Sequence, residues 1–238
     1  MSKTHQKHIN QILAALPLAQ YKRIASELKQ VNLKSGDILL EPKKEVNSIY
    51  FPQTAIISLV SIMIDGSTTE IGLVGNEGMI GIPAILGGRS TISRSIVQIP
   101  GSALKIPAEI VVQEFHRGGR FQQLTLLYIQ AFLTMVSQSV ACNRQHKIEE
   151  RLARWLLSVQ DCVFENEIPL TQEFIANMLG IRRSGVTVAA GILKQAGIIR
   201  YSRGNITILD RKGLEDTTCE CYQLVRNEFL RLLGSRRG

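Results

Sequence analysis

The spacing of hydrophobic and polar residues changes twice along the chain. In residues 9–28, apolar residues recur at helical spacing on either side of Pro17, which predicts two short helices. A different texture follows, in which short β-rich runs are separated by turn residues. The predicted strands are residues 38–40, 49–51, 55–64, 69–74, 92–99 and 102–106. So many closely spaced strands indicate a double-sheet jelly roll or a barrel.

Helical spacing returns at residue 107, and its main feature is a long helix over residues 120–142. This helix carries two apolar stripes on nearly opposite faces. One stripe contains Leu124, Tyr128, Ala131, Met135 and Cys142, and the other contains Leu126, Ile129, Leu133, Val136 and Val140. One face can pack on the β-rich domain of the same chain, and a second copy of the helix can cover the other. We therefore expect a two-fold homodimer; the alternative is a helix buried wholly within one chain.

The last third of the chain contains two short helices separated by a glycine corner. Residues 143–147 are polar and basic and predict a hinge, and residues 148–163 form a first helix beyond it. A helix over residues 170–179 can be capped by Thr171, and Gly180 supplies the corner before a helix over residues 182–195. The inward side of this last helix carries Val186, Ala189, Ala190 and Leu193, and the opposite side carries Arg183, Ser184, Thr187 and Lys194. These parts are those of a helix-turn-helix whose second helix enters a major groove.

Residues 170–194, together with residues 148–157, resemble the Crp/Fnr superfamily of bacterial transcription factors, named after the cyclic-AMP receptor protein and the fumarate-nitrate regulator. Residues 197–202 and 205–209, joined at Arg203 and Gly204, complete the likeness as the hairpin of a winged helix. One terminal helix is expected from Asp210 to about Leu233, and its Leu224, Phe229, Leu232 and Leu233 should cover the DNA-binding domain. The resemblance implies an α+β chain with three parts. These are a cyclic-nucleotide-binding-like jelly roll with N-terminal helices (1–117), a dimerisation helix and hinge (118–146) and a winged helix-turn-helix (147–238). The implied partners are double-stranded DNA, a second copy of the chain and RNA polymerase.

The candidate DNA contacts lie on the helix-turn-helix and the wing. An arginine such as Arg183 can bond to both O6 and N7 of guanine, and the methyl group of Thr187 can touch a thymine methyl. The N–H groups at the start of the first helix suit a phosphate. The candidate residues are Thr171, Gln172, Arg182, Arg183, Ser184, Thr187, Lys194, Tyr201 and Arg203. The alternative is that Arg182 and Arg183 form a solvated helix start.

Charge supports a polyanionic partner for the last third of the chain. The net charge is +8 over 238 residues, and residues 169–238 carry 11 Lys and Arg against 6 Asp and Glu. More than half of the excess positive charge therefore lies in this segment. A solvated basic surface is the alternative explanation.

The ligand pocket that the resemblance implies departs from the family pattern. Members that bind cyclic nucleotides place a glutamate for the ribose hydroxyl before an arginine and a serine or threonine for the phosphate. Here Ile82 stands where the glutamate is expected, and Arg94 and Ser95 are the candidate phosphate ligands. The missing glutamate argues against cyclic AMP, and Arg94 could equally be a strand residue facing solvent.

The four cysteines, Cys142, Cys162, Cys219 and Cys221, do not form a Cys-x-x-Cys pair. Iron-sulfur members of the superfamily carry cysteines near the N-terminus, and none precedes Cys142 here. Cys219 and Cys221 are two apart on a predicted helix, which would point them to different sides, so we expect buried, unreactive thiols. His146 lacks a partner at ligand spacing, and we predict neither a metal nor a cofactor.

The remaining alternatives concern location and activity. No apolar run is expected to reach the length that a membrane span needs, and the polar N-terminus lacks a signal-peptide core, which predicts a cytoplasmic protein. A nuclease or recombinase would need a carboxylate cluster or a nucleophile with a base; Glu149 and Glu150 instead belong to a charged helix face, so we predict no enzymatic activity. A regulator whose β-domain binds a protein, or no ligand, stays open.

Overall fold

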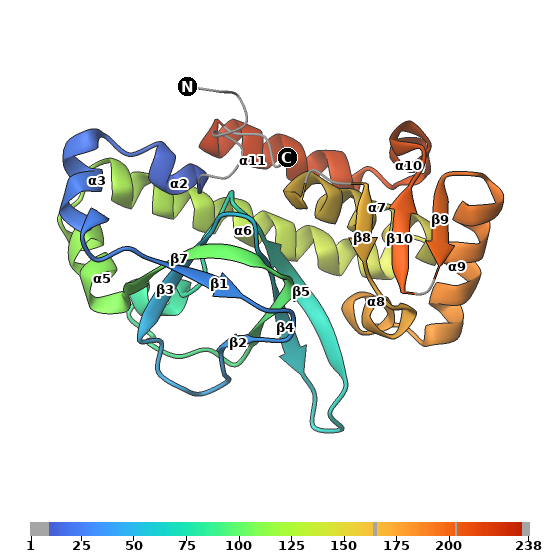
Figure 1. Ribbon diagram of the computed structural model, residues 1–238, viewed down its shortest axis with the longest axis horizontal. Helices are drawn as coiled ribbons and strands as arrows, with labels where there is room; N and C mark the ends of the chain where they lie inside the picture. The colour runs from blue at the N-terminus through green and yellow to red at the C-terminus, as the bar shows by residue number, and fades with distance from the viewer. Residues whose placement is uncertain (1–9, 164–165, 203, 235–238) are drawn as a thin grey trace.

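The computed structural model describes residues 10–163, 166–202 and 204–234. A β-rich domain occupies one end of the molecule, a long helix runs behind it, and a smaller helical domain with its own sheet occupies the other end (Figure 1). The predicted α+β class, with its β-rich domain, long helix and helix-turn-helix, is confirmed.

Two short helices open the described chain, α2 (Gln11–Ala14) and α3 (Leu18–Ala25). The Asn10 side chain caps α2 by accepting a hydrogen bond from the Leu13 N–H. Its Nδ2 also donates to the carbonyl oxygens of Pro52, at 3.0 Å, and Gly78, at 2.7 Å. These buried hydrogen bonds attach the N-terminal helices to the β-domain.

The β-domain contains two antiparallel sheets. The first has the strand order β1 (Lys29–Leu33), β7 (Gly101–Pro107), β3 (Ser48–Pro52), and the second the order β2 (Ile38–Leu40), β6 (Arg94–Ile99), β4 (Ile56–Ile62), β5 (Thr68–Val74). The short helix α4 (Ile82–Ile85) lies between β5 and β6 in sequence. Apolar side chains of both sheets meet in one core, for example Ile57, Val97 and Ala103. This double-sheet arrangement is the one expected from the strand spacing.

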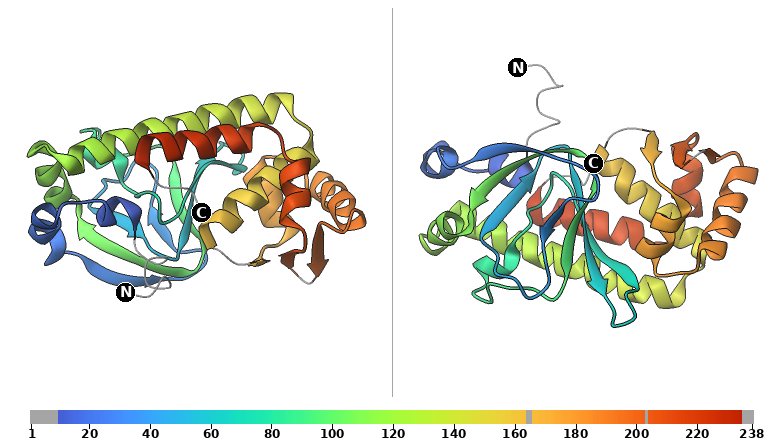
Figure 2. Two further views of the ribbon diagram at one scale, coloured as in Figure 1. Left: turned by 90° about the horizontal axis from the view of Figure 1, so that it is seen from above. Right: turned by 60° about the horizontal axis from the view of Figure 1, so that its bottom comes forward.

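Helices α5 (Ala108–His116) and α6 (Arg120–Gln145) follow the β-domain. One stripe of α6 is buried against the chain's own core, with Leu124, Tyr128 and Met135 almost completely inaccessible. The opposite stripe is exposed, with Leu126 50%, Leu133 60% and Val140 68% accessible. In the left view of Figure 2, α6 forms one edge of the molecule and its outer side is uncovered. The prediction of two apolar stripes, one packed on the same chain, agrees with these exposures.

Helix α6 is also long and apolar enough, by length and composition alone, to cross a membrane. The sequence analysis did not anticipate this, because it expected no apolar run of sufficient length. The same property is found in core helices of soluble proteins. Here one face of α6 packs on the β-domain of the same chain, and the opposite face is exposed.

The C-terminal domain begins with α7 (Ile148–Val163) and contains the two expected helices, α8 (Gln172–Leu179) and α9 (Arg183–Gln195). The wing consists of β9 (Ile199–Ser202) and β10 (Asn205–Ile208), and α10 (Arg211–Thr217) follows it. A third strand, β8 (Glu167–Pro169), completes a sheet of order β8-β10-β9. The sequence analysis missed β8 because a three-residue strand is too short to show a periodic pattern.

Two sequence predictions about the connections were wrong. The expected hinge over residues 143–147 is mostly helical, because α6 continues to Gln145 and leaves His146 and Lys147 between it and α7. Polar residues do not end a helix when their backbone hydrogen bonds continue. The expected single terminal helix is divided, since Thr218 adopts an extended conformation after α10 and a separate helix, α11 (Cys221–Leu233), begins beyond it.

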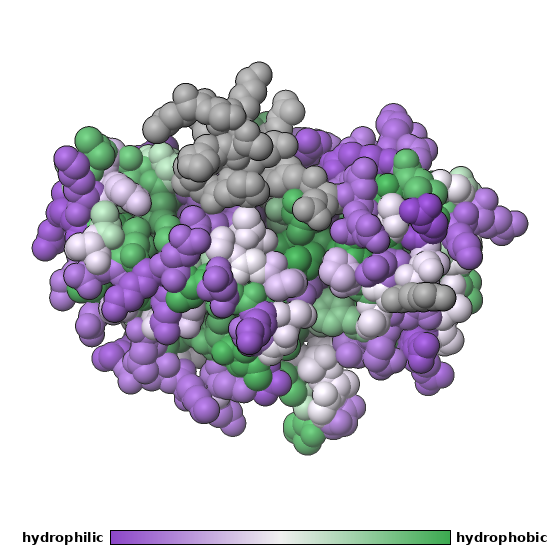
Figure 3. Space-filling model, in the orientation of Figure 1, coloured by the Kyte–Doolittle hydropathy of each residue, from purple (hydrophilic) through white to green (hydrophobic). Residues whose placement is uncertain are grey.

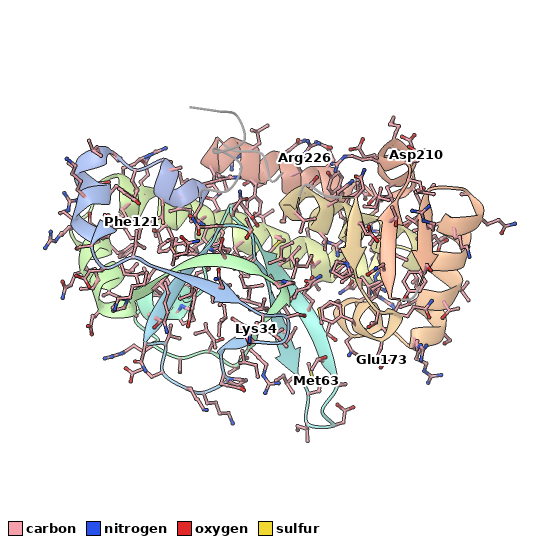
Figure 4. All side chains as sticks on the ribbon, in the orientation of Figure 1. Lys34, Met63, Phe121, Glu173, Asp210 and Arg226 are labelled. Atoms are coloured by element: carbon pink, nitrogen blue, oxygen red, sulfur yellow. The ribbon has the colours of Figure 1, made fainter. Side chains whose placement is uncertain are left out.

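Helix α11 packs beside α6 rather than covering the DNA-binding domain as expected (Figure 2, left). Val225 and Phe229 join the core that contains Phe121 and Leu124 of α6. Leu224, which we expected to be covered, is 51% exposed. In Figure 4, Asp210 and Arg226 mark the start of α10 and the middle of α11, on the two sides of the break between these helices.

The two domains are packed against each other through a shared core. It combines Ile56 and Leu73 of the second sheet with Trp155 of α7 and Met178 of α8. The indole Nε1–H of Trp155 donates to Glu70 Oε1 of β5 at 3.0 Å. This interface places the helix-turn-helix beside the hairpin of β4 and β5. Met63, labelled in Figure 4, and Ile64 are exposed near the tip of this hairpin. Hydrophobic surface is visible at the bottom of Figure 3.

Candidate nucleic-acid interface

Helix α8 is built as the first helix of the motif. Its N-cap, Thr171, has extended backbone angles, and its Oγ1 accepts a hydrogen bond from the Phe174 N–H at 3.2 Å. Glu173 lies in the first turn, where a negative charge favours the helix dipole, and it points away from the molecule in Figure 4. The helix ends at Gly180, whose φ of 61° is left-handed and therefore suited to glycine.

Helix α9 presents a polar face to solvent at its N-terminus. Arg182 is its N-cap and has extended backbone angles, and Arg183 and Ser184 begin the helix; all three residues are exposed. Val186, Ala189, Ala190 and Leu193 are buried on the opposite side, as the periodicity predicted. Burial of that apolar side fixes the direction in which the arginines and the serine point.

Thr187 connects the two helices of the motif. Its Oγ1 lies 2.9 Å from Gln172 Oε1 on α8 and 3.1 Å from the Arg183 carbonyl oxygen. Both candidate residues therefore belong to one polar contact at the exposed surface. The hydroxyl can donate to one acceptor at a time, so a phosphate or base edge competes for it with these protein oxygens.

The sequence analysis missed one part of the exposed face. Val188 is 65% exposed and lies on α9 one residue after Thr187. An exposed valine on this helix offers methyl groups that could contact the thymine methyl in a major groove. The helical period places Val188 on the side opposite the buried Val186 and Ala190, so its exposure could be predicted from the sequence.

The remaining candidates flank α9. Lys194 is exposed in the last turn of the helix, and Tyr201 in β9 is half-buried, with its ring against the domain core. Arg203 lies outside the described residues. The hairpin register pairs Tyr201 with Ile206, which holds the wing against β8 on its other side.

Charged groups within the C-terminal domain stabilise the positions of the helices that form the interface. Arg151 of α7 donates through Nη2 to the Leu179 carbonyl oxygen at the end of α8, and burial lowers the pKa of its guanidinium. Arg211 of α10 bonds to Asp161 at 2.7 Å and to Glu215 at 3.0 Å. Burial acts to lower the pKa of Arg211, but the hydrogen bond and charge of Asp161 outweigh it, and the pKa is raised. These contacts fix α8 and α10 to α7.

Arg94 and Ser95, the residues expected to bind a cyclic phosphate, have partners within the β-domain. Arg94 donates through Nε and Nη2 to Glu41 Oε2, both at 3.1 Å. These two N–H groups of the guanidinium are therefore already hydrogen-bonded to a carboxylate of the same domain. Ser95 is buried and lines a cavity of about 30 Å³ together with Ile82 and Phe132. Pockets for small molecules usually measure about 300–1,000 Å³. The cavity is therefore much smaller than such pockets, and Arg94 is already paired with Glu41.

Two domain families match the chain. The profile described as a Crp-like helix-turn-helix domain matches residues 150–217, and the profile described as a cyclic nucleotide-binding domain matches residues 30–118. Comparison with curated protein sequences returned no significant match.

Solved structures of similar fold cover both domains. A regulator of the Crp/Fnr family from Eubacterium rectale superposes with a TM-score of 0.69 at 22% identity, over 87% of this chain and 96% of that one. FixK2 from Bradyrhizobium japonicum superposes with a TM-score of 0.69 at 14% identity, over 81% of this chain and 98% of that one. A Crp/Fnr-family regulator from Thermus thermophilus superposes with a TM-score of 0.66 at 20% identity, over 79% of this chain and 97% of that one.

The similarity to these structures concerns the fold, and the two domain families carry the relationship. They occur in the order expected for this architecture, and the C-terminal match includes both α8 and α9. The chain therefore belongs to the Crp/Fnr superfamily and is a DNA-binding transcription regulator.

Proposed function

We propose that this regulator binds a near-palindromic duplex site as a homodimer and reads it with α9. The observation that carries the proposal is the outward face of α9, where exposed Arg183, Ser184 and Thr187 stand at the N-terminal end above a buried apolar side. In helix-turn-helix proteins, this end of the second helix reaches the base edges.

The proposed contacts fall into two groups. Base contacts are assigned to the exposed start of α9, with Val188 added to the residues expected from the sequence. Phosphate contacts are assigned to the N-terminus of α8, where N–H groups are directed outward, and to the wing. The base-contact set is Arg182, Arg183, Ser184, Thr187 and Val188, and the phosphate set is Thr171, Gln172, Lys194, Tyr201 and Arg203.

The exposed stripe of α6 supports a dimer. Leu126, Leu133 and Val140 recur every seven residues, as in the seam of a coiled coil, and all three are exposed in a single chain. Pairing this stripe with its copy would present two α9 helices, which need to lie about 34 Å apart to enter successive major grooves. Such a dimer, bound near a promoter, could contact RNA polymerase.

Selection of bound sequences from random duplex DNA tests the proposal directly. We expect two related half-sites about 10 base pairs apart centre to centre. On the selected site, Arg183→Ala should cost about 1–3 kcal/mol, or roughly tenfold to a hundredfold in affinity, and should relax the preference at one base pair. Arg117→Ala, which removes an exposed arginine from the β-domain, is the matched control and should bind normally.

Two results would contradict this assignment. A selection that yields no sequence preference would exclude specific readout. Equal losses for Arg183→Ala on selected and random DNA would reduce Arg183 to a phosphate contact, whereas Lys194→Ala is expected to behave in that way.

A second candidate is a regulator that does not respond to cyclic nucleotides. The cavity of about 30 Å³ and the engagement of Arg94 by Glu41 favour it. In this case the β-domain binds a protein, or binds no ligand, and regulation depends on the abundance of the protein. Calorimetry with cyclic AMP and cyclic GMP, using Arg94→Ala as control, should show no binding; tight binding that Arg94→Ala abolishes would restore Arg94 and Ser95 as phosphate ligands.

The same proposal places the protein in the cytoplasm, where its DNA target lies, and assigns it no reaction. Three buried carboxylates support this assignment, since Glu114 pairs with Arg23, Asp161 pairs with Arg211, and Glu77 accepts a hydrogen bond from the Gly75 N–H. A cleavage assay on supercoiled DNA with divalent metal should leave the substrate intact. Metal-dependent nicking would instead favour a DNA-processing enzyme.

A further inference from the structure

Four residues with metal-binding side chains converge where α6, α10 and α11 meet. Cys142 lies in the last turns of α6, His146 is the C-cap of that helix, Cys219 lies between α10 and α11, and Cys221 begins α11. Their ligand atoms all lie within 4.8 Å of one another. The group is not evident as a whole from the sequence, because more than seventy residues separate its two halves. The expectation that His146 lacks a partner at ligand spacing was wrong, since Cys142 lies four residues earlier, one helical turn away.

The separations within this cluster suit a single tetrahedral ion. Cys142 Sγ lies 3.5 Å from Cys219 Sγ, and Cys221 Sγ lies 3.5 Å from His146 Nδ1. Zinc binds sulfur at about 2.3 Å and nitrogen at about 2.0 Å, so tetrahedral ligands lie about 3.5–3.8 Å from each other. An iron-sulfur cluster distributes its ligands over several irons and needs them farther apart.

The three cysteines of the cluster are buried, and His146 lies at its edge with its side chain 19% exposed. Cys142 and Cys221 are 0% exposed and Cys219 is 7% exposed. A position left open for water or substrate characterises catalytic zinc sites, whereas four protein ligands in a buried setting characterise structural ones. The expectation that Cys219 and Cys221 point to different sides of one helix was wrong, since Cys219 precedes α11 and both thiols face the same cluster.

Neighbouring side chains orient two of the ligands. His146 presents Nδ1 to Cys221, and its other nitrogen, Nε2, lies 3.2 Å from Glu220 Oε2. Metal-binding histidines commonly donate their second N–H to a carboxylate in this way, which fixes the ring and its tautomer. Gln138 Nε2 donates to Cys221 Sγ at 3.1 Å, an interaction that stabilises a thiolate.

The charged residues around the cluster also favour an anionic zinc complex. Three thiolates and one Zn²⁺ carry a net charge of −1, and the guanidinium groups of Arg151 and Arg154 interact electrostatically with the cysteines. Burial of an anionic complex is less costly when cations lie beside it.

We propose that Cys142, His146, Cys219 and Cys221 bind one Zn²⁺ in a closed Cys₃His site, with Glu220 and Gln138 as positioning residues. Binding is a ligand exchange without redox change, because the thiols release their protons to solvent as the sulfur–zinc bonds form. The ion joins the end of α6, the link between the domains and the start of α11.

The position of this site gives it a mechanical role. His146 belongs to the two-residue link between α6 and α7, and Cys219 and Cys221 follow the DNA-binding domain in the chain. An ion bound to both would fix the DNA-binding domain relative to the dimerisation helix. This consequence rests on the proposed function, whereas the metal site itself does not.

Metal analysis of the purified full-length protein tests the site without DNA. We expect about one zinc per chain, reduced at least tenfold in Cys219→Ser. Cys162→Ser is the matched control, because Cys162 is the remaining buried cysteine and lies in α7, 3.9 Å from Glu77 Oε2 and outside the cluster; it should retain the zinc. Glu220→Gln is a milder change that preserves all four ligands, and it should lower the affinity for zinc about tenfold in chelator competition.

Replacement by cobalt gives a second readout. Metal-free protein titrated with Co²⁺ should develop the intense visible bands of tetrahedral cobalt-thiolate coordination, saturating near one equivalent. Absence of bound metal together with absence of these bands overturns the proposal. So does iron-sulfur absorption in the protein as isolated, or a metal-free Cys142–Cys219 disulfide found by mass spectrometry. These readouts remain interpretable even if the protein does not bind DNA.

Discussion

At the scale of single residues, Thr187 is placed to keep the two helices of the motif in register. Its hydroxyl lies within hydrogen-bonding distance of Gln172 on α8 and of the Arg183 carbonyl oxygen in its own helix. A side chain held between two protein oxygens loses little freedom when DNA arrives. Rigid presentation of polar groups lowers the cost of ordering them on binding.

Replacement of Thr187 by valine removes this hydroxyl while retaining its shape. We expect a loss of about 0.5–1.5 kcal/mol in DNA affinity, or roughly twofold to tenfold, from the lost hydrogen bond. Fluorescence anisotropy with labelled operator DNA measures it. Thr217→Val is the matched control, since Thr217 Oγ1 makes the same kind of contact to a carbonyl, that of Gly213, at 2.7 Å in α10. Normal affinity of Thr187→Val would exclude a role for the Thr187 hydroxyl in DNA binding and leave only a contact of its methyl group.

Two glycines of the motif should respond oppositely to alanine. Gly180 has a φ of 61°, and an added Cβ would lie 3.0 Å from Thr69, so Gly180→Ala should destabilise the fold by about 1–2 kcal/mol. Gly191 is helical and nothing lies within 4 Å of an added Cβ, so Gly191→Ala should stabilise it by about 0.5–1 kcal/mol. Urea denaturation measures both changes. Equal effects of the two substitutions would contradict this interpretation of Gly180.

At the scale of elements, the parts found from the sequence are those defined by local signals. Helices α8 and α9 were predictable because a threonine cap, a glycine corner and an apolar face all lie within about thirty residues. Strand β8 and helix α11 were not. Strand β8 is defined by its pairing with β10, and the direction of α11 depends on its packing against α6, some ninety residues earlier. Contacts of that range have no periodic signature.

The exposed stripe of α6 gives a prediction at this scale. Leu133→Glu would place one charge from each subunit in the centre of the proposed dimer interface. The dissociation constant of the dimer should rise by at least a hundredfold, because burial of each leucine contributes about 1.5–3 kcal/mol. Light scattering over a dilution series measures the change. Leu86→Glu is the matched control, since Leu86 and Leu133 are both 60% exposed and Leu86 lies in the β-domain. An unchanged dimer in Leu133→Glu would exclude this face.

At the scale of the whole molecule, the candidate site divides into a predictable and an unpredictable part. The DNA-binding face could be found because its residues lie on one helix. The Cys₃His cluster and the pairing of Arg94 with Glu41 could not, since each depends on two segments that only the fold brings together. The sequence showed the missing glutamate at Ile82, but only the structure showed that Phe132 of α6 helps to fill the space.

The contact between the domains also gives a prediction. Trp155→Phe retains the ring packing but removes the N–H donated to Glu70, so it should loosen the docking of α7 and α8 on β5. Hydrogen-deuterium exchange should become severalfold faster in β5 and α8 than in the unchanged protein, consistent with a loss of about 1 kcal/mol. Tyr128→Phe removes an aromatic donor within one domain, to the Met79 carbonyl oxygen, and should leave exchange at the interface unchanged. Exchange that is equally slow in both variants would show that packing alone holds the domains.

Trp155 is the only tryptophan in the chain, and its side chain is 3% exposed between the two domains. Indole emission moves to longer wavelength when the ring enters water, so the natural fluorescence of the protein reports on one event, the separation of the helix-turn-helix from the β-domain. The fluorescence of Trp155 therefore monitors the separation of the two domains without an added label. It can be followed in a cuvette while operator DNA, zinc or a cell extract is added.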